Sequence, residues 1–292
     1  MIQIKELYKG YGGKNVLRGL NLEIADGAVF GLVGINGAGK STLLRVLSGV
    51  LKADGGEVFI DGQGVYENTA VKKGIFFLPD DPYYESNVTA EGLADVYRAF
   101  YGFDEKIFEN FLEEFSLDRR KPIRNFSKGM KRQVFVALAL ACQPKYLFLD
   151  EAFDGLDPLA RLIFKRGLIE LVEKKGTTVI ISSHSLRELE DICDSYGILD
   201  GGGISSSGDL TETLAGIRKL QMAFEREVKE EELGFPCLLF EKTGRVVQIV
   251  VKGEVEEILQ KIAQLKPMFV EEIEVDFEEM FVSEIKNRGY IR

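Results

Sequence analysis

The sequence predicts an α/β protein with a mainly parallel core sheet, followed by a small C-terminal α+β domain. Two apolar runs, Tyr146–Leu149 and Thr178–Ser182, flank a helical segment from Pro158 to Lys175. The order strand, helix, strand is typical of a parallel sheet. A third apolar run, Val29–Val33, leads through a glycine-rich loop into a predicted helix over Ser41–Leu51. These three runs therefore define the predicted core.

The other elements of the first 150 residues follow from the spacing of apolar side chains and glycines. Short β-type runs between glycine turns predict strands at Ile2–Leu7, Leu22–Ile24, Ala28–Val33, Glu57–Ile60 and Ile75–Leu78. From Thr89 to Cys142 the apolar period becomes helical, which predicts a helical region.

The glycine- and serine-rich sequence Gly201–Gly208 predicts a turn and a domain boundary. We expect one large unit over residues 1–215 and a small α+β domain over residues 216–292, because a chain of this length favours about two domains. The elements expected in the small domain are strands at Leu220–Glu225, Cys237–Phe240, Val246–Val251 and Phe269–Val275, and helices over Glu254–Gln264 and from Glu278.

Composition limits the classes of function. With 45% hydrophobic and 29% charged residues, the chain is typical of a soluble globular protein, and its net charge of −10 argues against a nucleic-acid-binding surface. The three cysteines form no C-x-x-C pair and there is one histidine, so neither a disulfide framework nor zinc catalysis is indicated. No signal peptide or membrane span is expected, since the longest apolar stretch, Val134–Cys142, is far shorter than the about 20 residues that a span needs. A reducing cytosol is the expected compartment.

The strongest chemical signal is a phosphate-binding loop after the run Val29–Val33. Residues 34–41, GINGAGKS, match G-x-x-x-x-G-K-[ST] at every fixed position. Glycines let backbone N–H groups surround a phosphate, and the N-terminus of the following helix favours its charge. Lys40 would hold the β- and γ-phosphates, and the Ser41 hydroxyl would be a ligand of Mg²⁺; the alternative is a strand-to-helix turn without a ligand. The predicted nucleotide-binding residues of this segment are Gly34, Asn36, Gly37, Ala38, Gly39, Lys40, Ser41 and Thr42.

Two adjacent acids end the predicted strand Tyr146–Leu149. Asp150 has the position of the aspartate that holds Mg²⁺ beside a phosphate loop. Glu151 is expected to point the other way, because neighbouring strand residues face opposite sides, and to take a proton from an attacking water. Alone, such a pair is more often a solvated strand end; the phosphate loop in the same chain favours the catalytic interpretation.

With these motifs in place, residues 1–215 resemble the nucleotide-binding subunit of ATP-binding cassette (ABC) transporters. The segment Asn125–Gln133, NFSKGMKRQ, is similar to the family signature L-S-G-G-Q and stands before a helical run. The resemblance implies a P-loop nucleotidase cassette with a mainly parallel core sheet, an antiparallel β subdomain and a helical signature subdomain over about residues 82–143. It also implies a dimer in which two cassettes face head to tail around two ATP molecules.

The resemblance implies that four residues of the signature, Ser127, Lys128, Gly129 and Met130, lie at the nucleotide. Ser127 and the Gly129 backbone would contact the γ-phosphate bound by the second subunit. Lys128 and Met130 depart from the family pattern, which leaves the strength of the site open. The alternative for Ser127 is the N-cap of an ordinary helix.

Three more residues have positions that match the family. Asp157 follows Glu151 at the place of the D-loop, which couples the two nucleotide sites. His184 follows Thr178–Ser182, which is expected to be the last strand of the core sheet. It matches the family's switch histidine at the γ-phosphate. Tyr11 corresponds to the aromatic residue that stacks on adenine. Without the resemblance, a single histidine or a tyrosine in a turn indicates little.

Asp80 stands where the family has the glutamine of the Q-loop. Aspartate accepts hydrogen bonds without donating them and adds negative charge near the triphosphate. Coordination of Mg²⁺ would offset that charge, so we expect Asp80 to be a metal ligand; the alternative is an unrelated surface acid. By the resemblance, the loop Pro79–Glu85 contacts the membrane subunit.

The function that the resemblance implies is hydrolysis of ATP with Mg²⁺, with Glu151 as general base and Lys40 and His184 at the γ-phosphate. The subunit would work as a homodimer or heterodimer on a separately encoded permease, in the export branch of the family. It would be cytoplasmic and peripheral on the inner face of the cell membrane, with membrane contact only through the permease and without a nucleic-acid partner.

Two other classes of function are alternatives to transport. A soluble ABC ATPase of translation or DNA maintenance is disfavoured by the single motif set, by the short distance between phosphate loop and signature, and by the lack of a basic tail. A degenerate cassette that binds ATP as a regulatory module stays open because of Asp80, Lys128 and Met130.

Overall fold

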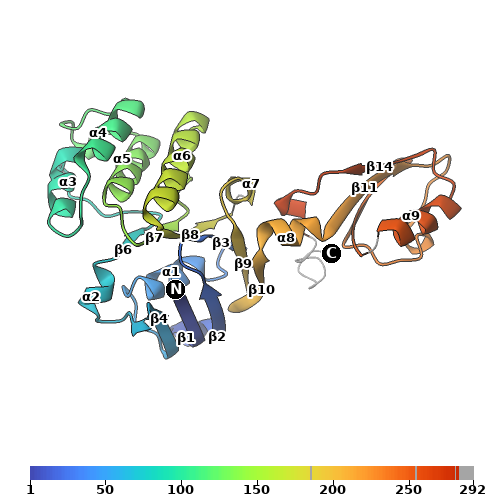
Figure 1. Ribbon diagram of the computed structural model, residues 1–292, viewed down its shortest axis with the longest axis horizontal. Coiled ribbons are helices and arrows are strands. Elements are labelled where there is room, and N and C mark those ends of the chain that lie inside the picture. Colours follow the sequence, from blue (N-terminus) through green and yellow to red (C-terminus); the bar gives the residue numbers. More distant parts are fainter. Residues whose placement is uncertain (185, 254, 280, 283–292) are drawn as a thin grey trace. The chain divides into compact units, whose positions relative to one another are not determined.

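A six-stranded sheet runs through the first of two units, Met1–Ser207, in the order β10-β9-β3-β8-β7-β6 (Figure 1). The structure is a computed structural model that describes all residues except 185, 254, 280 and 283–292. The strands are β3 (Val29–Val33), β6 (Ile75–Leu78), β7 (Tyr146–Asp150), β8 (Thr178–Ser183), β9 (Ser195–Asp200) and β10 (Gly203–Asp209). Strands β6, β7, β8, β3 and β9 pair in parallel, so their carboxyl ends meet at one edge. This arrangement confirms the predicted α/β core.

The same unit also contains a four-stranded antiparallel sheet, in the order β2-β1-β4-β5. Its strands are β1 (Ile2–Tyr11), β2 (Lys14–Ile24), β4 (Gly55–Ile60) and β5 (Gln63–Gly64). Buried side chains of β1, among them Ile2 and Leu7, share one apolar cluster with Leu43 of helix α1 (Lys40–Leu47) and Phe148 of β7. This shared core fixes the beginning of α1 against the parallel sheet.

The remaining helices of the first unit include a group, α3 to α6, that lies together in Figure 1. The helices are α2 (Thr69–Lys72), α3 (Ala90–Arg98), α4 (Glu105–Glu114), α5 (Lys128–Ala141), α6 (Pro158–Lys175) and α7 (Leu186–Glu190), with a short 3₁₀ helix at Ile123–Asn125. The Thr89 hydroxyl caps α3 and the Asp104 carboxylate caps α4. None of the helices in the described part of the chain is long and apolar enough to cross a membrane.

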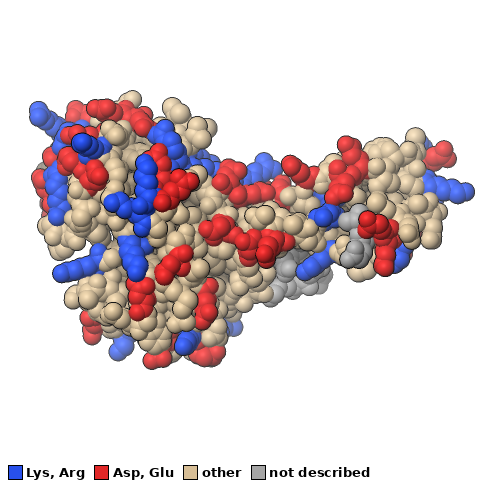
Figure 2. Space-filling view, viewed as in Figure 1, with Lys and Arg blue, Asp and Glu red and all other residues tan. Residues whose placement is uncertain are grey.

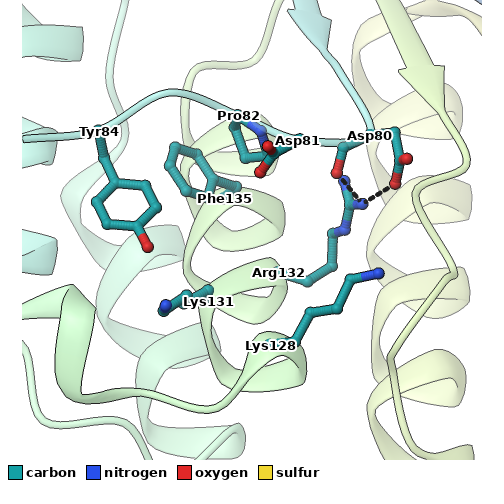
Figure 3. Close-up of a pocket in the computed structure, with 8 residues that line it drawn as sticks. All are labelled: Asp80, Asp81, Pro82, Tyr84, Lys128, Lys131, Arg132 and Phe135. Carbon is teal, nitrogen blue, oxygen red and sulfur yellow. Dashed lines mark hydrogen bonds and ion pairs between the residues drawn. The ribbon is translucent and has the colours of Figure 1, made fainter.

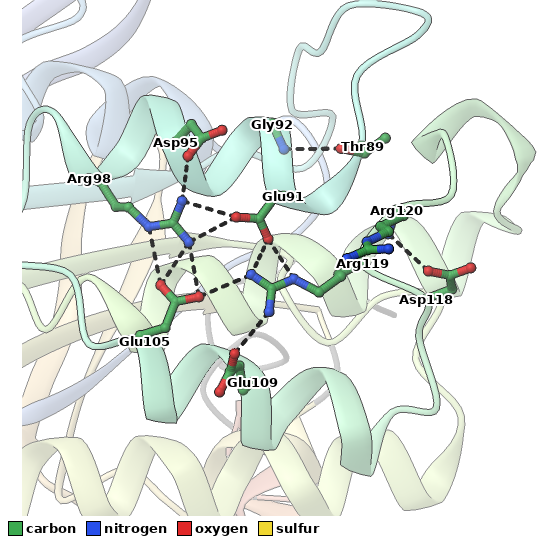
Figure 4. A network of polar contacts seen from close by, with 10 residues as sticks. All are labelled: Thr89, Glu91, Gly92, Asp95, Arg98, Glu105, Glu109, Asp118, Arg119 and Arg120. Atoms are coloured by element: carbon green, nitrogen blue, oxygen red, sulfur yellow. Dashed lines mark hydrogen bonds and ion pairs between the residues drawn. The ribbon is translucent and has the colours of Figure 1, made fainter.

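Ion pairs connect the helices of this group (Figure 4). Arg98 of α3 reaches Glu105 of α4 at 2.7 Å, and Arg119 contacts both Glu91 of α3 and Glu109 of α4. These side chains are about one-third to one-half exposed, so each pair contributes little alone. Together they hold α3, α4 and the segment after α4 in one arrangement.

Two expectations about the end of the first unit are wrong. The sequence Gly201–Gly208 is not a turn throughout: only Gly201 and Gly202 have a left-handed backbone, and β10 begins at Gly203. The strand β8 is not the last of the core, since β9 and β10 follow it. Because β10 is an edge strand with half-buried and exposed side chains, it lacks the apolar alternation by which strands are predicted. The first compact unit ends at Ser207, within the segment Gly201–Gly208 where a boundary is expected, and the bound at residue 215 stays a prediction.

The second unit, Gly208–Arg292, contains a four-stranded antiparallel sheet in the order β12-β13-β11-β14. Its elements are α8 (Leu210–Ala215), β11 (Ile217–Ala223), a 3₁₀ helix at Glu230–Glu232, β12 (Leu239–Thr243), β13 (Val246–Lys252), α9 (Val255–Gln264) and β14 (Phe269–Ile273). Leu220, Met222, Ile249 and Ile262 form its core, which joins the sheet to α9. The helix expected from Glu278 lies mostly outside the described residues.

Candidate nucleotide-binding and hydrolysis site

The phosphate loop connects β3 to α1 at the carboxyl edge of the parallel sheet. Gly39, with φ of 113°, begins the helix without a side-chain cap, and a Cβ there would lie 2.9 Å from a methyl carbon of Val16. Only glycine fits this conformation and this close approach. The first N–H groups of α1 therefore have no side-chain acceptor and can donate hydrogen bonds to a phosphate.

Lys40 is buried at the start of α1, with 6% of its surface exposed. Its Nζ donates a hydrogen bond to the Gly34 carbonyl at 2.7 Å and lies 3.5 Å from Oε1 of Glu151. A buried ammonium group needs such partners, because desolvation without them is costly. The side chain thus lies between the loop and the Glu151 carboxylate.

Asp150 ends β7 and is 1% exposed. Its Oδ1 accepts hydrogen bonds from the hydroxyls of Ser41 at 3.0 Å and Ser182 at 2.8 Å. Its Oδ2 is buried and has no hydrogen-bond partner among the described residues. A buried carboxylate oxygen without a partner, beside a serine hydroxyl, is the oxygen-rich environment that Mg²⁺ prefers. The residues present therefore fit a magnesium ion.

Glu151 lies just beyond β7 with φ of 49°, a backbone conformation that the sequence analysis did not anticipate. Its N–H donates to the Ser182 carbonyl at 3.1 Å. Its carboxylate contacts Lys40 through Oε1 and His184 through Oε2. The left-handed backbone is uncommon for a side chain of this size, and it occurs at the position predicted for the general base.

His184 follows β8, and its Nδ1 lies 2.8 Å from Oε2 of Glu151 and 3.9 Å from the carboxylate of Asp154. Its backbone N–H also donates to Glu151 at 3.2 Å. The hydrogen bond to Glu151 raises the pKa of His184 above its usual value of 6.5, because it favours the charged ring. The structure thus brings together five predicted site residues, namely Lys40, Ser41, Asp150, Glu151 and His184.

The signature residues form the beginning of α5. Ser127 is the N-cap, and its Oγ accepts the N–H of Met130 at 3.2 Å, while Lys128 is exposed. Gly129 lies against the backbone of Gly155, where an added Cβ would come within 2.5 Å of the carbonyl oxygen. The signature turn and the segment after Glu151 are therefore in contact within one chain.

Two other predicted residues have local roles in the structure. Asp157 caps α6, accepting the N–H of Ala160 at 2.9 Å. Tyr11 ends β1, and its half-exposed ring has the ammonium group of Lys9 5.6 Å from its centre. Both can still face a nucleotide or a second subunit, because neither side chain is enclosed.

Sequence reasoning missed two partners of the site. Ser182 supports Asp150, and Arg132 of α5 forms an ion pair with Asp80 at 2.9 Å, with Oδ1 of Asp80 as the acceptor. Asp80 is thus paired with a cation of the protein, a contact that the sequence analysis did not consider. The available signal for Ser182 was a serine at the carboxyl end of a core strand, and for Arg132 it was an arginine within the signature segment.

A phosphate loop with a buried lysine, a serine hydroxyl and two strand-end acids defines a P-loop nucleotidase. Comparisons with known proteins narrow the class. Residues 17–154 match the family model described as "ABC transporter". The chain is 31% identical over 287 residues to the ABC transporter ATP-binding protein YtrB of Bacillus subtilis, and the match covers 97% of each protein. It therefore belongs to the ATP-binding proteins of ABC transporters, a family of ATPases.

Further relatives and solved structures agree with this assignment. The chain is 32% identical to the lantibiotic transport ATP-binding protein SrtF of Streptococcus pyogenes over 77% of this chain and 99% of that protein. It is 34% identical to the linearmycin resistance ATP-binding protein LnrL of Bacillus subtilis over 76% of this chain and 74% of that protein. The solved structure of an ATP-binding subunit of an ABC transporter matches with a TM-score of 0.67 and 30% identity, covering 73% of this chain and 91% of that one. A bacterial cassette solved as a dimer shares the fold, with a TM-score of 0.65 and 23% identity over 72% of this chain and 99% of that one.

Proposed function

We propose that the protein hydrolyses Mg-ATP between two cassettes and drives a separately encoded permease that exports its substrate. The observation that carries the hydrolytic part is the convergence of Lys40, Asp150 and Glu151 at one sheet edge, with Oδ2 of Asp150 buried and unpaired. Mg²⁺, when bound, would neutralise charge on the β- and γ-phosphates. The serine and aspartate oxygens of Ser41 and Asp150 would hold the ion.

The chemical step proposed for this site is attack of water on the γ-phosphorus. Glu151 takes a proton from the water, whose oxygen forms the new bond to phosphorus while the bond to the β,γ-bridging oxygen breaks and ADP leaves. Before this step, as ATP binds, Lys40 exchanges its contact with the Gly34 carbonyl for the phosphate oxygens. His184, already at Glu151, is placed to contact the γ-phosphate.

The second cassette completes this proposed site. Ser127 and Gly129 of one subunit would contact the γ-phosphate bound by the other, Asp157 would connect the two sites, and Tyr11 would stack on adenine. The N-terminus of α5 is available for this because Ser127 caps only the Met130 N–H. Whether the second copy is identical or a related subunit is decided by mixing experiments with tagged chains.

The partner proposed for the membrane side is a permease that contacts the loop Pro79–Glu85 and holds the subunit at the cytoplasmic face of the membrane. Export is supported by the names of two relatives, a lantibiotic transport protein and a linearmycin resistance protein. A nucleic-acid partner is not proposed, since basic and acidic side chains are interspersed on the face shown in Figure 2 and the net charge is −10.

Phosphate release by the purified protein in Mg-ATP tests the hydrolytic proposal, with Glu151→Gln as the inactive variant. Hydrolysis that survives in Glu151→Gln contradicts the role of Glu151. The observations that favour a regulatory cassette instead are Lys128 and Met130 in the signature. ATP binding without any hydrolysis, also in the presence of the permease, would establish that second function.

A further inference from the structure

Arg132 is a buried cation whose contacts the hydrolytic site does not use. It lies on α5, shortly after the signature residues 127–130, and its side chain is 3% exposed. Nη1 donates to the Pro79 carbonyl at 3.0 Å. Nη2 donates to both the carbonyl and the carboxylate of Asp80, as Figure 3 shows. All three acceptors belong to the loop that follows β6.

The number and type of these bonds make the contact a strong one. A buried guanidinium group without partners is costly, and Arg132 donates three hydrogen bonds to acceptors on this single loop. The planar guanidinium fork can reach several acceptors at once, which an ammonium group at the same place cannot do in the same way. Asp80 is about half exposed, so the buried partner that fixes the pair is Arg132.

Aromatic contacts extend the same attachment along the loop. The ammonium group of Lys131 lies 5.4 Å from the ring centre of Tyr84, and the rings of Tyr84 and Phe135 are 6.2 Å apart. The loop Pro79–Tyr84 is thus attached to α5 at its beginning and at its end.

This attachment joins two parts of the candidate nucleotide site: the loop beside the strand that ends in Asp150, and the helix that begins at the signature. Leu78 at the end of β6 pairs with Leu149 of β7, so the loop begins beside the strand that ends in Asp150. Helix α5 begins at the signature. We propose that Arg132 is a positioning residue that clamps the loop Pro79–Tyr84 to α5, with Asp80 as its counter-ion, so that loop and signature move as one body. The clamp gives Asp80 a role toward Arg132 in place of one toward Mg²⁺.

Hydrogen–deuterium exchange of the isolated protein tests the clamp without relying on dimer formation. In Arg132→Met, the amides of residues 80, 81 and 83–85 should exchange at least about fivefold faster, because the loop loses all three hydrogen bonds from Arg132. The matched control is Arg120→Met, which removes an exposed arginine of the same region. Unchanged exchange of the loop in a folded Arg132→Met protein would overturn the clamp. If this variant does not fold, Arg132→Lys and Asp80→Ala are measured instead, and both should accelerate exchange in the loop.

A second measurement concerns function and rests on the proposed dimer. In the Glu151→Gln background, Arg132→Met should raise the ATP concentration at half-maximal dimer formation by about five- to tenfold, whereas ATP affinity of the monomer, measured with a fluorescent analogue, changes less than about twofold. A purely structural role would weaken both. If Glu151→Gln itself stays monomeric, the proposed function fails; if it dimerises and Arg132→Met leaves the curve unchanged, the clamp fails. An increased Mg²⁺ requirement in Asp80→Asn, without faster loop exchange, would return Asp80 to the metal site.

Discussion

The two units of the protein bury different kinds of side chain. The interior of the first unit includes charged and polar residues, among them Lys40, Arg132, Asp150 and Ser182, whereas every buried residue in the described part of the second unit is apolar. Burying a charged group costs free energy that apolar packing does not. Several of these groups lie at the phosphate loop or at the neighbouring loop Pro79–Tyr84, whereas Glu188, also buried, pairs with Arg161. The difference places the buried charged groups of the candidate site in the first unit.

The largest effect is expected from Lys40→Ala. The variant removes the ammonium group that contacts both the Gly34 carbonyl and Glu151, so phosphate release should fall by roughly 10²–10³-fold. Lys52→Ala, which removes an exposed lysine, is the control and should keep full activity. Substantial hydrolysis by Lys40→Ala would mean that the buried cation serves packing and would remove the distinction between the units.

Asp150→Asn should increase the Mg²⁺ concentration needed for hydrolysis by about tenfold or more. The substitution removes the negative charge at Oδ2, while the amide oxygen can still accept the hydroxyls of Ser41 and Ser182. The measurement is the ATPase rate as a function of free Mg²⁺ at saturating ATP. An unchanged dependence would exclude Asp150 as a metal ligand.

Ile249→Ala probes the second unit. Ile249 is fully buried in the second core, and the cavity should cost about 2–5 kcal/mol of unfolding free energy there. The rate of phosphate release should stay within about twofold of the wild-type rate. Ile180→Ala, in the core of the first unit, is the matched comparison and should lower both stability and hydrolysis. A parallel loss of activity in Ile249→Ala would show that the second unit supports catalysis.

The smallest effect concerns the titration of His184. Because its hydrogen bond to Glu151 raises its pKa, the charged pair is complete below pH 6.5, and its contribution to stability is lost as the pH rises through the higher folded pKa. His184 is the only histidine, so its ring signals in an NMR titration are unambiguous. Glu151→Gln should lower the midpoint toward the usual value, and an unchanged midpoint would contradict the contact.

Features with a strong local pattern were predicted from the sequence, and features made by distant contacts were not. The helix Pro158–Lys175 and the strand Ile75–Leu78 have the predicted bounds, because apolar periodicity and flanking turn residues determine them. The strand β10 was missed, since its serines carry no such pattern. The bond between Arg132 and Asp80 joins residues 52 positions apart, which no spacing rule relates. The left-handed backbone of Glu151 has no sequence signature either.

The most direct test of the account is the mass of Glu151→Gln in saturating Mg-ATP, measured by size-exclusion chromatography with light scattering. Glu151 is placed to remove the proton that hydrolysis requires, so the variant should retain ATP and accumulate as a dimer of the 32.7 kDa chain. Without nucleotide, or with Lys40→Ala added, the same protein should be a monomer. A monomer at saturating Mg-ATP, with bound ATP confirmed, would contradict the proposal that two cassettes close around the nucleotide.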